Sequence, residues 1–307
     1  MMIDVVVPSY RRPEPLAACL AGLRAQWMPA SRVVVVLRAG DDTSELVVRR
    51  SGVAGASVVT VSGAGQVAAL RAGVAASSAP LVAFTDDDAV PRPDWVQRIA
   101  AHFDDPAVGG VGGRDVVATD FSPPDGCLVV GRVGKWGKVH GNHHRGAGPA
   151  RDVDILKGAN MAFRRAALAV PRGLIGSGAE PHNDAAMSLH ARSLGWRVVY
   201  DPQVVVDHFP AARVEGSMRG QTGAADVRTG AYNLTSALLS TGTVTWWRRL
   251  VFGVFVGDRG TPGIARTAGA LASRADRREM LHRLGPSICG QVAAARNYHR
   301  GDRLAFD

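Results

Sequence analysis

Four short apolar runs, separated by more polar segments, constrain the fold of this chain more than any other sequence feature. They occupy residues 3–7, 33–37, 58–61 and 81–85. Each run is apolar at most of its positions, which is typical of strands buried on both faces of a parallel sheet. The alternation therefore predicts an α/β fold in which a Rossmann-like, mostly parallel sheet is flanked by helices.

A helix is predicted to begin at Pro13 or Pro15, because proline suits the first helical turn. Its apolar stripe recurs at spacings of three and four and consists of Leu16, Cys19, Leu20, Leu23 and Trp27. Similar patterns predict further elements: helices over 66–76 and about 184–194, and strands over 197–200 and 203–207.

Two glycine-rich stretches, 109–113 and 131–148, interrupt this regularity. Glycine favours turns, so a mobile loop is expected there. Lys135 and Trp136 in the second stretch suit a ligand-binding loop, because an aromatic ring can face a ring of the ligand and a cation can bind phosphate. The nearby histidines are not expected to bind zinc, since a fourth ligand is missing from this segment.

The length of 307 residues and the 46% hydrophobic content suit one large globular domain with an appendage. The sequence contains no uncharged apolar stretch of about 18 residues that could cross a bilayer. Residues 1–7 lack the basic region and cleavage site of a secretory signal, so a cytoplasmic location is expected. The three cysteines lie far apart, and each is expected to be a buried, inert thiol.

Positive charge is concentrated near the C-terminus. Residues 1–212 carry 22 basic and 20 acidic side chains, whereas residues 213–307 carry 14 arginines and 7 acidic side chains. Strand–helix alternation also stops near residue 213, which predicts an α/β domain over 1–212 and a basic helical C-terminal extension over 213–307. The extension should attract an anionic partner. Nucleic acid is not expected, because no recognised binding motif accompanies the charge.

Three consecutive carboxylates, Asp86, Asp87 and Asp88, follow the apolar run 81–85. Ligands of parallel α/β sheets bind where the carboxyl ends of the strands converge. Adjacent carboxylates repel one another unless a cation lies between them, and oxygen ligands favour Mg2+ or Mn2+, which could in turn hold a diphosphate. From these residues alone, a solvated acidic turn is equally compatible.

The usual phosphate-binding loops are absent from the sequence. The first apolar run leads into Pro8, Ser9 and Tyr10 rather than into G-x-G-x-x-G, and G-x-x-x-x-G-K-[ST] occurs nowhere. Dinucleotide-binding and P-loop chemistry are therefore not expected.

Three segments carry a family resemblance: Val5 to Leu16, which includes Pro8-Ser9-Tyr10-Arg11-Arg12, then the aspartate triplet, and then Gly158 to Arg165. Together they resemble the family 2 glycosyltransferases, which have the GT-A fold, and the resemblance covers about residues 3–210. It implies a nucleotide-diphosphate sugar donor, a divalent metal, and inversion at the anomeric carbon. The acceptor would be a hydroxyl of a glycan, plausibly a lipid-linked one.

The resemblance also implies site residues. Asp86, Asp88 and His208 would hold Mg2+ or Mn2+. The donor would contact a set drawn from the first loop, the triplet and the later glycine turn: Pro8, Tyr10, Arg11, Asp86, Asp87, Gly158, Ala159 and Asn160. Leu37 and Arg38 stand where relatives usually have acidic residues that contact the base or ribose, so the base remains open.

Inverting transfer also needs a general base that is separate from the metal ligands. Asp184 resembles the aspartate of the family's Glu-Asp pair, although Asn183 replaces the glutamate. The alternative is that Asp184 only stabilises a helix N-terminus. His208 ends an apolar run, and without the resemblance a structural role would be the simpler interpretation.

Trp246, Trp247, Arg248 and Arg249 precede an apolar run at 250–256. Tryptophan beside arginine is typical of a membrane interface, which would place the protein peripherally on the inner face of the plasma membrane. A helix packed on the catalytic domain, with its arginines reaching solvent, is equally compatible.

Two other functions are compatible with the same residues. A sugar-phosphate nucleotidyltransferase could use the same sheet and acidic pair. A nucleotide-sugar- or glycan-binding protein that has lost turnover is suggested by Asn183.

Overall fold

The computed structural model describes residues 1–117, 126–176, 178–211, 223–273 and 277–307. Its central sheet has nine strands: β1 Ile3–Ser9, β2 Arg32–Arg38, β3 Ala56–Val61, β4 Leu81–Phe84, β5 Ala89–Pro91, β6 Val108–Val117, β9 Arg151–Asp152, β10 Met161–Arg164 and β12 Arg197–His208. The order is β3-β2-β1-β4-β10-β6-β12-β5, with β9 on β12. Pairing is parallel among β1 to β4 and between β6 and β12, and antiparallel for β5, β9 and β10. The predicted mostly parallel α/β sheet is confirmed.

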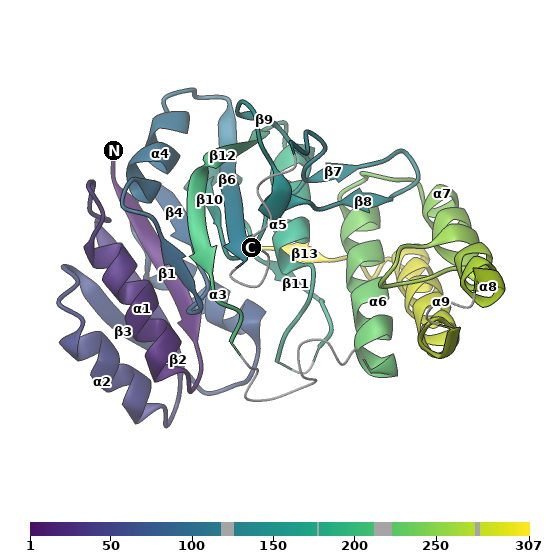
Figure 1. Cartoon of the computed structure of the whole chain (residues 1–307), viewed down its shortest axis with the longest axis horizontal. Coiled ribbons are helices and arrows are strands. Elements are labelled where there is room, and N and C mark those ends of the chain that lie inside the picture. The colour runs from purple at the N-terminus through teal and green to yellow at the C-terminus, as the bar shows by residue number, and fades with distance from the viewer. Residues whose placement is uncertain (118–125, 177, 212–222, 274–276) are drawn as a thin grey trace.

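Helices cover the sheet on both faces (Figure 1). They are α1 Pro13–Arg24, α2 Asp42–Arg50, α3 Gln66–Ala76, α4 Trp95–His102 and α5 Asn183–Ser193. Val5 and Val7 of β1 pack in one apolar cluster with α1 and α4, whereas Val6 packs in a second cluster with α3 and α5. Because successive residues of a strand point to opposite faces, a strand covered on both sides must be apolar throughout.

Helix α1 ends earlier than its predicted stripe. The structure ends it at Arg24, and Trp27 lies beyond it with 72% of its surface exposed. Including Trp27 in the buried stripe was wrong. Helix α2 was not predicted, because its only buried residues are Ser44 and Val48 and its apolar stripe is too narrow to detect. The thiol expectation holds for Cys19, which is buried, but is wrong for Cys289, which is exposed.

The expected loop is wrong for residues 109–113, whereas residues 131–148 are mainly loop and turn with a few short regular elements. Residues 109–113 belong to β6, where glycine permits close strand packing: a Cβ on Gly113 would lie 1.8 Å from the carbonyl oxygen of Val204. The second stretch contains a hairpin, β7 Arg132–Val133 with β8 Val139–His140, and the 3-10 helix η1 His143–Arg145. His143 is buried, with its Nε2 3.0 Å from the carbonyl oxygen of Ile155.

The C-terminal part is helical, as predicted. Its elements are α6 Ala224–Ser240, α7 Trp246–Val251, the π-helical turn η3 Phe252–Val256, α8 Ile264–Ser273, α9 Arg277–Arg300 and β13 Ala305–Phe306. A third apolar cluster joins Leu189 of α5 to Leu234 and Leu238 of α6. After the 3-10 helix η2 (Arg165–Ala167), β11 Pro171–Arg172 pairs with β13. The expected boundary at 212/213 lies outside the described residues.

Figure 1 shows α6, α7, α8 and α9 gathered at one end of the molecule, with the β7–β8 hairpin reaching toward them. Among the helices that the structure describes, none is long and apolar enough to span a membrane.

Candidate active site

A cavity of about 640 Å³ opens at the carboxyl ends of β1, β2 and β4, where the topology predicts a ligand. Most of the predicted site residues line it: Pro8, Tyr10, Asp86, Asp87, Asp88, Gly158, Ala159, Asp184 and His208. Segments that are far apart in the sequence therefore meet at a single cavity.

Two predicted donor contacts lie elsewhere among the described residues. Asn160 is fully buried; its Oδ1 accepts from Trp95 Nε1 at 2.8 Å, and its Nδ2 donates to the carbonyl oxygen of Val204 at 2.9 Å. Arg11 is exposed, and its backbone N–H donates to Asp41 Oδ2 at 2.5 Å. The side chain of Asn160 thus ties the sheet to α4 instead of facing the cavity.

Strand pairing brings His208 to the aspartate triplet. β5 follows the triplet directly and pairs antiparallel with β12, so that Ala89 lies opposite His208. Asp88 is further fixed because its Oδ2 accepts from the backbone N–H of Ala211 at 2.9 Å. As a result, His208 Nε2 lies 3.2 Å from Asp88 Oδ1.

Asp86, Asp88 and His208 form a group with the geometry of a metal site. Each offers one ligand atom, and these atoms lie within 4.8 Å of one another. Two carboxylates and an imidazole match the donors that Mn2+ accepts, and the carboxylates alone suit Mg2+. The residues present therefore fit a divalent cation.

The electrostatics of this group favour binding a cation. Burial, followed by repulsion from Asp88 and Asp87, raises the pKa of Asp86 to about 6. Burial lowers the pKa of His208, but the neighbouring carboxylates of Asp115 and Asp88 outweigh burial and raise that pKa to about 9. Protons therefore occupy this site readily in the absence of a metal, and a divalent ion would replace them.

Asp115 is a site residue that the sequence interpretation missed. It lies on β6, in parallel register with Val206 of β12, and its Oδ2 is 3.8 Å from His208 Nδ1. Burial alone would raise its pKa, but the nearby imidazole of His208 and the charge of Lys157 lower it. A carboxylate behind a ligating histidine fixes the orientation of the imidazole ring. Its sequence signal is a lone aspartate within a glycine- and valine-rich strand.

Asp87 faces the first loop rather than the group of ligands. Its Oδ2 accepts from Ser9 Oγ at 2.7 Å, and its Oδ1 accepts from Arg12 Nη1 at 2.8 Å. Arg12 also lies 3.7 Å from Asp88. Ser9 and Arg12, which were not predicted as site residues, thus anchor the triplet to the end of β1.

Asp184 lies in the first turn of α5 and lines the same cavity as the first loop. Its Oδ2 accepts from the backbone N–H of Gly158 at 3.0 Å, and its Oδ1 accepts from that of Ala185 at 2.8 Å. A Cβ on Gly158 would lie 3.7 Å from the Asp184 side chain, so the glycine turn packs directly on this carboxylate. Two backbone donors therefore fix the orientation of Asp184.

Of the polar residues near the start of α5, one contacts α3 and the others line the cavity. Glu180 turns away to α3, where its Oε2 accepts from the backbone N–H of Val67 at 3.0 Å. His182 lines the cavity with a left-handed backbone, φ 69°, and burial lowers its pKa, so the imidazole is neutral near pH 7. Asp184 is left as the carboxylate of this turn that lines the cavity.

Tyr10 and Arg38 define the far end of the cavity. The guanidinium of Arg38 lies 5.0 Å from the centroid of the Tyr10 ring, within the range of a cation–π interaction. Asp41 has a structural role, because its carboxylate accepts hydrogen bonds from the backbone N–H of Arg11 and from that of Ser44 in the first turn of α2. An aromatic ring and a guanidinium provide a flat surface on which a nucleobase could stack.

Comparison with known proteins identifies the family of this chain. The family model described as "Glycosyltransferase like family 2" matches residues 2–223. The chain therefore belongs to the glycosyltransferase-like family 2, and the predicted family membership is confirmed.

A curated relative is the glycosyltransferase AglE of Haloferax volcanii, 27% identical over 135 residues. That match covers 42% of this chain and 43% of the relative, so it spans less than half the length of the curated protein.

Solved structures with similar folds confirm the GT-A architecture. The mannosyltransferase PcManGT from Pyrobaculum calidifontis, in complex with GDP-Man and Mn2+, has a TM-score of 0.59 at 19% identity, covering 95% of this chain and 86% of that one. S. aureus TarS 1-349, in complex with UDP-GlcNAc, has a TM-score of 0.56 at 14% identity, covering 100% and 97%. At these identities the likeness establishes the fold.

Proposed function

We propose that this chain is a metal-dependent, inverting glycosyltransferase that moves a hexosyl or deoxyhexosyl group from a nucleotide-diphosphate donor to a hydroxyl of a glycan or lipid-linked acceptor. The observation that carries the proposal is the meeting of two carboxylate sets in one cavity: Asp86 and Asp88 with His208, and Asp184 on α5. The complexes of PcManGT with GDP-Man and Mn2+ and of TarS with UDP-GlcNAc support a nucleotide-sugar donor.

Asp86, Asp88 and His208 would hold Mg2+ or Mn2+, and the bound ion would supply stabilisation of the negative charge on the leaving diphosphate. Two neighbouring contacts keep these residues in position. Asp115 orients the imidazole of His208, and Arg12 holds the triplet against β1. Groups fixed before the substrate arrives need little reorganisation during the reaction.

Asp184 is the general base of the proposal. It takes the proton of the acceptor hydroxyl as the oxygen attacks the anomeric carbon opposite the diphosphate. The backbone N–H groups of Gly158 and Ala185 fix the orientation of this carboxylate, which lines the cavity. Neutral His182 beside it can position the acceptor by donating or accepting a hydrogen bond.

The nucleotide base would stack near Tyr10, with Pro8 and Arg38 beside it, and the sugar would lie by Gly158 and Ala159. Within this proposal, residues 1–212 form the donor-binding and catalytic domain, and residues 213–307 form an extension packed on it. Asp87 would support donor binding indirectly, because it holds the loop after β1 through Ser9 and Arg12.

A screen of nucleotide diphosphates and nucleotide sugars, with Mn2+ or EDTA, tests the proposal by thermal unfolding. A bound ligand stabilises the native state by mass action, so a donor should raise the melting temperature only when the ion is present. Hydrolysis of the stabilising sugar nucleotide, followed by NMR of the released anomer, tests inversion. Release of diphosphate from a nucleoside triphosphate and a sugar phosphate would instead identify a nucleotidyltransferase and overturn the proposal.

A further inference from the structure

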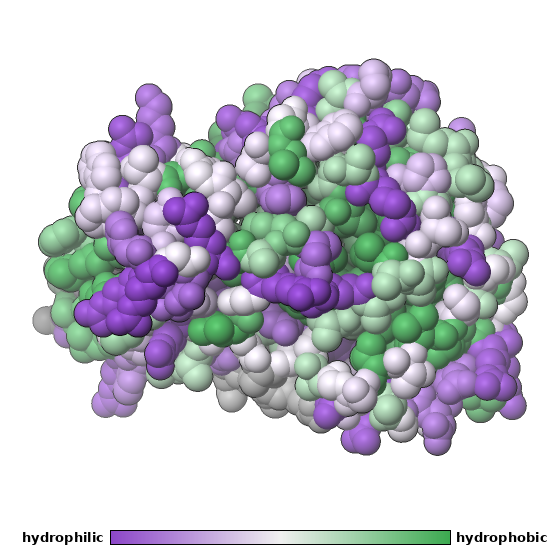
Figure 2. Space-filling view, turned by 180° about the vertical axis from the view of Figure 1, so that it is seen from behind, coloured by the Kyte–Doolittle hydropathy of each residue, from purple (hydrophilic) through white to green (hydrophobic). Residues whose placement is uncertain are grey.

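Large apolar side chains are exposed together on α7, η3 and the start of α8. We call this surface the apolar patch; its members are Trp246, Trp247, Val251, Phe255, Val256 and Ile264. Each is between 42% and 55% exposed. In Figure 2, which is turned by half a turn from Figure 1, apolar residues lie among hydrophilic ones at the edge where α7 and α8 are placed.

The patch is held rigidly although its side chains face outward. Arg249 on α7 is buried, with 1% exposure; it donates to the carbonyl oxygen of Gly137 at 3.1 Å and to Thr235 Oγ1 at 3.1 Å. The ring of Trp247 meets that of Trp136 edge to face, with centroids 5.5 Å apart. α7 is therefore fastened both to α6 and to the tip of the β7–β8 hairpin.

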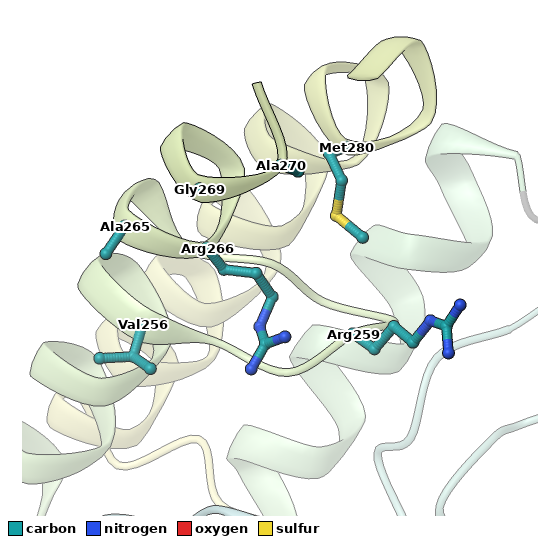
Figure 3. A pocket seen from close by; sticks show the side chains of 7 residues that line it. All are labelled: Val256, Arg259, Ala265, Arg266, Gly269, Ala270 and Met280. Carbon is teal, nitrogen blue, oxygen red and sulfur yellow. The ribbon is translucent and has the colours of Figure 1, made fainter. Parts of the chain in front are cut away.

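Cationic side chains border the patch. The guanidinium of Arg248 lies 5.2 Å from the ring of Trp247. Arg259 and Arg266 line an open cavity of about 640 Å³ together with apolar Val256 and Met280. Figure 3 shows Arg266 and Met280 extending from neighbouring helices toward the loop that carries Arg259. A site that offers guanidinium groups beside apolar walls suits a phosphate joined to an apolar tail.

The charge of the whole segment agrees with such a ligand. Residues 246–283 contain eight arginines and three acidic residues. A like-charged second copy would be repelled by this surface, whereas an anionic surface would be attracted. Nucleic acid would use the charge but would leave the aliphatic members of the patch in water.

From this combination we infer that α7, η3 and α8 dock on the surface of an anionic phospholipid bilayer. Trp246, Trp247 and Phe255 enter the interfacial layer, and Arg248, Arg259 and Arg266 bind lipid phosphates. The inference goes beyond the proposed transferase function and does not depend on it. The helix is also packed on the rest of the chain, as in the alternative predicted from the sequence, but Arg249 is buried instead of reaching solvent. Its neighbours Trp246, Trp247 and Arg248 are exposed.

Flotation of the full chain with phospholipid vesicles tests the inference. Vesicles of phosphatidylcholine alone should retain little protein, whereas vesicles containing phosphatidylglycerol should bind it and release it as salt is raised. Phe255→Ser combined with Arg259→Glu should weaken binding by at least about tenfold. The matched control, Leu46→Ser with Arg50→Glu, changes an exposed leucine and an exposed arginine on α2 and should bind as wild type.

Circular dichroism and the melting temperature verify that each variant is folded. If the double variant unfolds, Phe255→Ser alone and the salt titration of the wild type still give an answer. Equal binding to neutral and anionic vesicles, equal loss in the control, or no vesicle binding at all would each overturn the inference. So would a dimer in light scattering that the patch variant converts to monomer without any effect on vesicles.

Discussion

The aspartate edge of the sheet and the C-terminal extension both concentrate charge, but they use it in opposite ways. At the edge, Asp87, Asp88 and His208 are all less than 9% exposed and each has a polar neighbour within 4 Å. In the extension, Arg248 is exposed beside the exposed ring of Trp247, and Arg259 is exposed beside apolar Val256 and Met280. Buried charges act on a small ligand at fixed positions, whereas exposed charges attract a large surface.

The difference follows from desolvation. A buried carboxylate is costly unless another group compensates its charge, so the edge is tuned to bind a cation. An exposed arginine keeps its hydration and costs little, but its attraction is screened by salt. Substitutions at the aspartate edge should therefore abolish turnover. Substitutions in the C-terminal extension should change the free energy of unfolding or the binding to membranes.

The largest effect is expected for Asp88→Ala. Under the proposed function, loss of one carboxylate from the metal group should lower turnover by about 10³-fold or more, because a bound ion would stabilise the leaving diphosphate. Calorimetry should show that donor binding no longer depends on Mn2+. Asp105→Ala, which removes an exposed carboxylate paired with Arg197, is the control and should keep both properties. Metal-dependent binding that persists in Asp88→Ala would contradict the assignment of the ligand.

Asp184→Asn should have the next largest effect. The amide keeps the shape of the side chain but cannot accept the acceptor's proton, so turnover should fall by about 10²- to 10⁴-fold. Donor affinity, measured by calorimetry with Mn2+, should change little because Asp184 is not among the metal group. A loss of turnover without a loss of donor affinity would distinguish the proposed general base from the proposed metal ligands. Full turnover by Asp184→Asn with the correct acceptor would remove it from the mechanism.

Gly290→Ala tests the packing of the extension alone. A Cβ at Gly290 would lie 2.3 Å from the carbonyl oxygen of Arg228 in α6, so α6 and α9 would have to separate. Overpacking of this kind should lower the free energy of unfolding by about 1–3 kcal/mol in urea titrations. Gly269→Ala, which meets nothing within 4 Å in α8, should be neutral or slightly stabilising. Equal losses in the two variants would show that α6 and α9 do not pack as described.

The smallest effect concerns the buried His143 near the β7–β8 hairpin. Burial lowers its pKa below 6.5, so the unfolded chain binds a proton that the folded chain resists. Stability from this group is complete above about pH 6.5 and is lost as pH falls below it. Urea titrations should show a shallower loss on acidification in His143→Gln, whereas exposed His144→Gln should behave as wild type. Identical pH profiles of His143→Gln and wild type would contradict this.

Local patterns predicted much of the fold and of the candidate site. The apolar runs at 3–7 and 81–85 are strands β1 and β4, because burial on both faces leaves a one-dimensional signal. The aspartate triplet was visible because it directly follows such a strand. Residues 109–113 were misjudged because glycine suits both a loop and a tightly packed strand, and only the nearness of Val204 separates the two.

Contacts between distant segments could not be predicted. Asp115 depends on the register of β6 against β12, Ser9 and Arg12 on the turn of the first loop toward Asp87, and the inward position of Asn160 on its bond to Trp95. None of these partners is near in sequence. A one-residue change of register would turn Asp115 to the other face of β6.

The sequence by itself determined the first strands of the parallel sheet, the carboxylates at the end of β4 and the excess of arginine near the C-terminus, because these are local properties of composition and period. The tertiary structure decided which charges are buried and which are exposed. Arg249 and its neighbour Arg248 show this most simply: one bonds to Gly137 in the interior and the other lies on Trp247 at the surface. Burial depends on what packs around a residue, and Gly137, which packs on Arg249, is 112 residues away in the sequence.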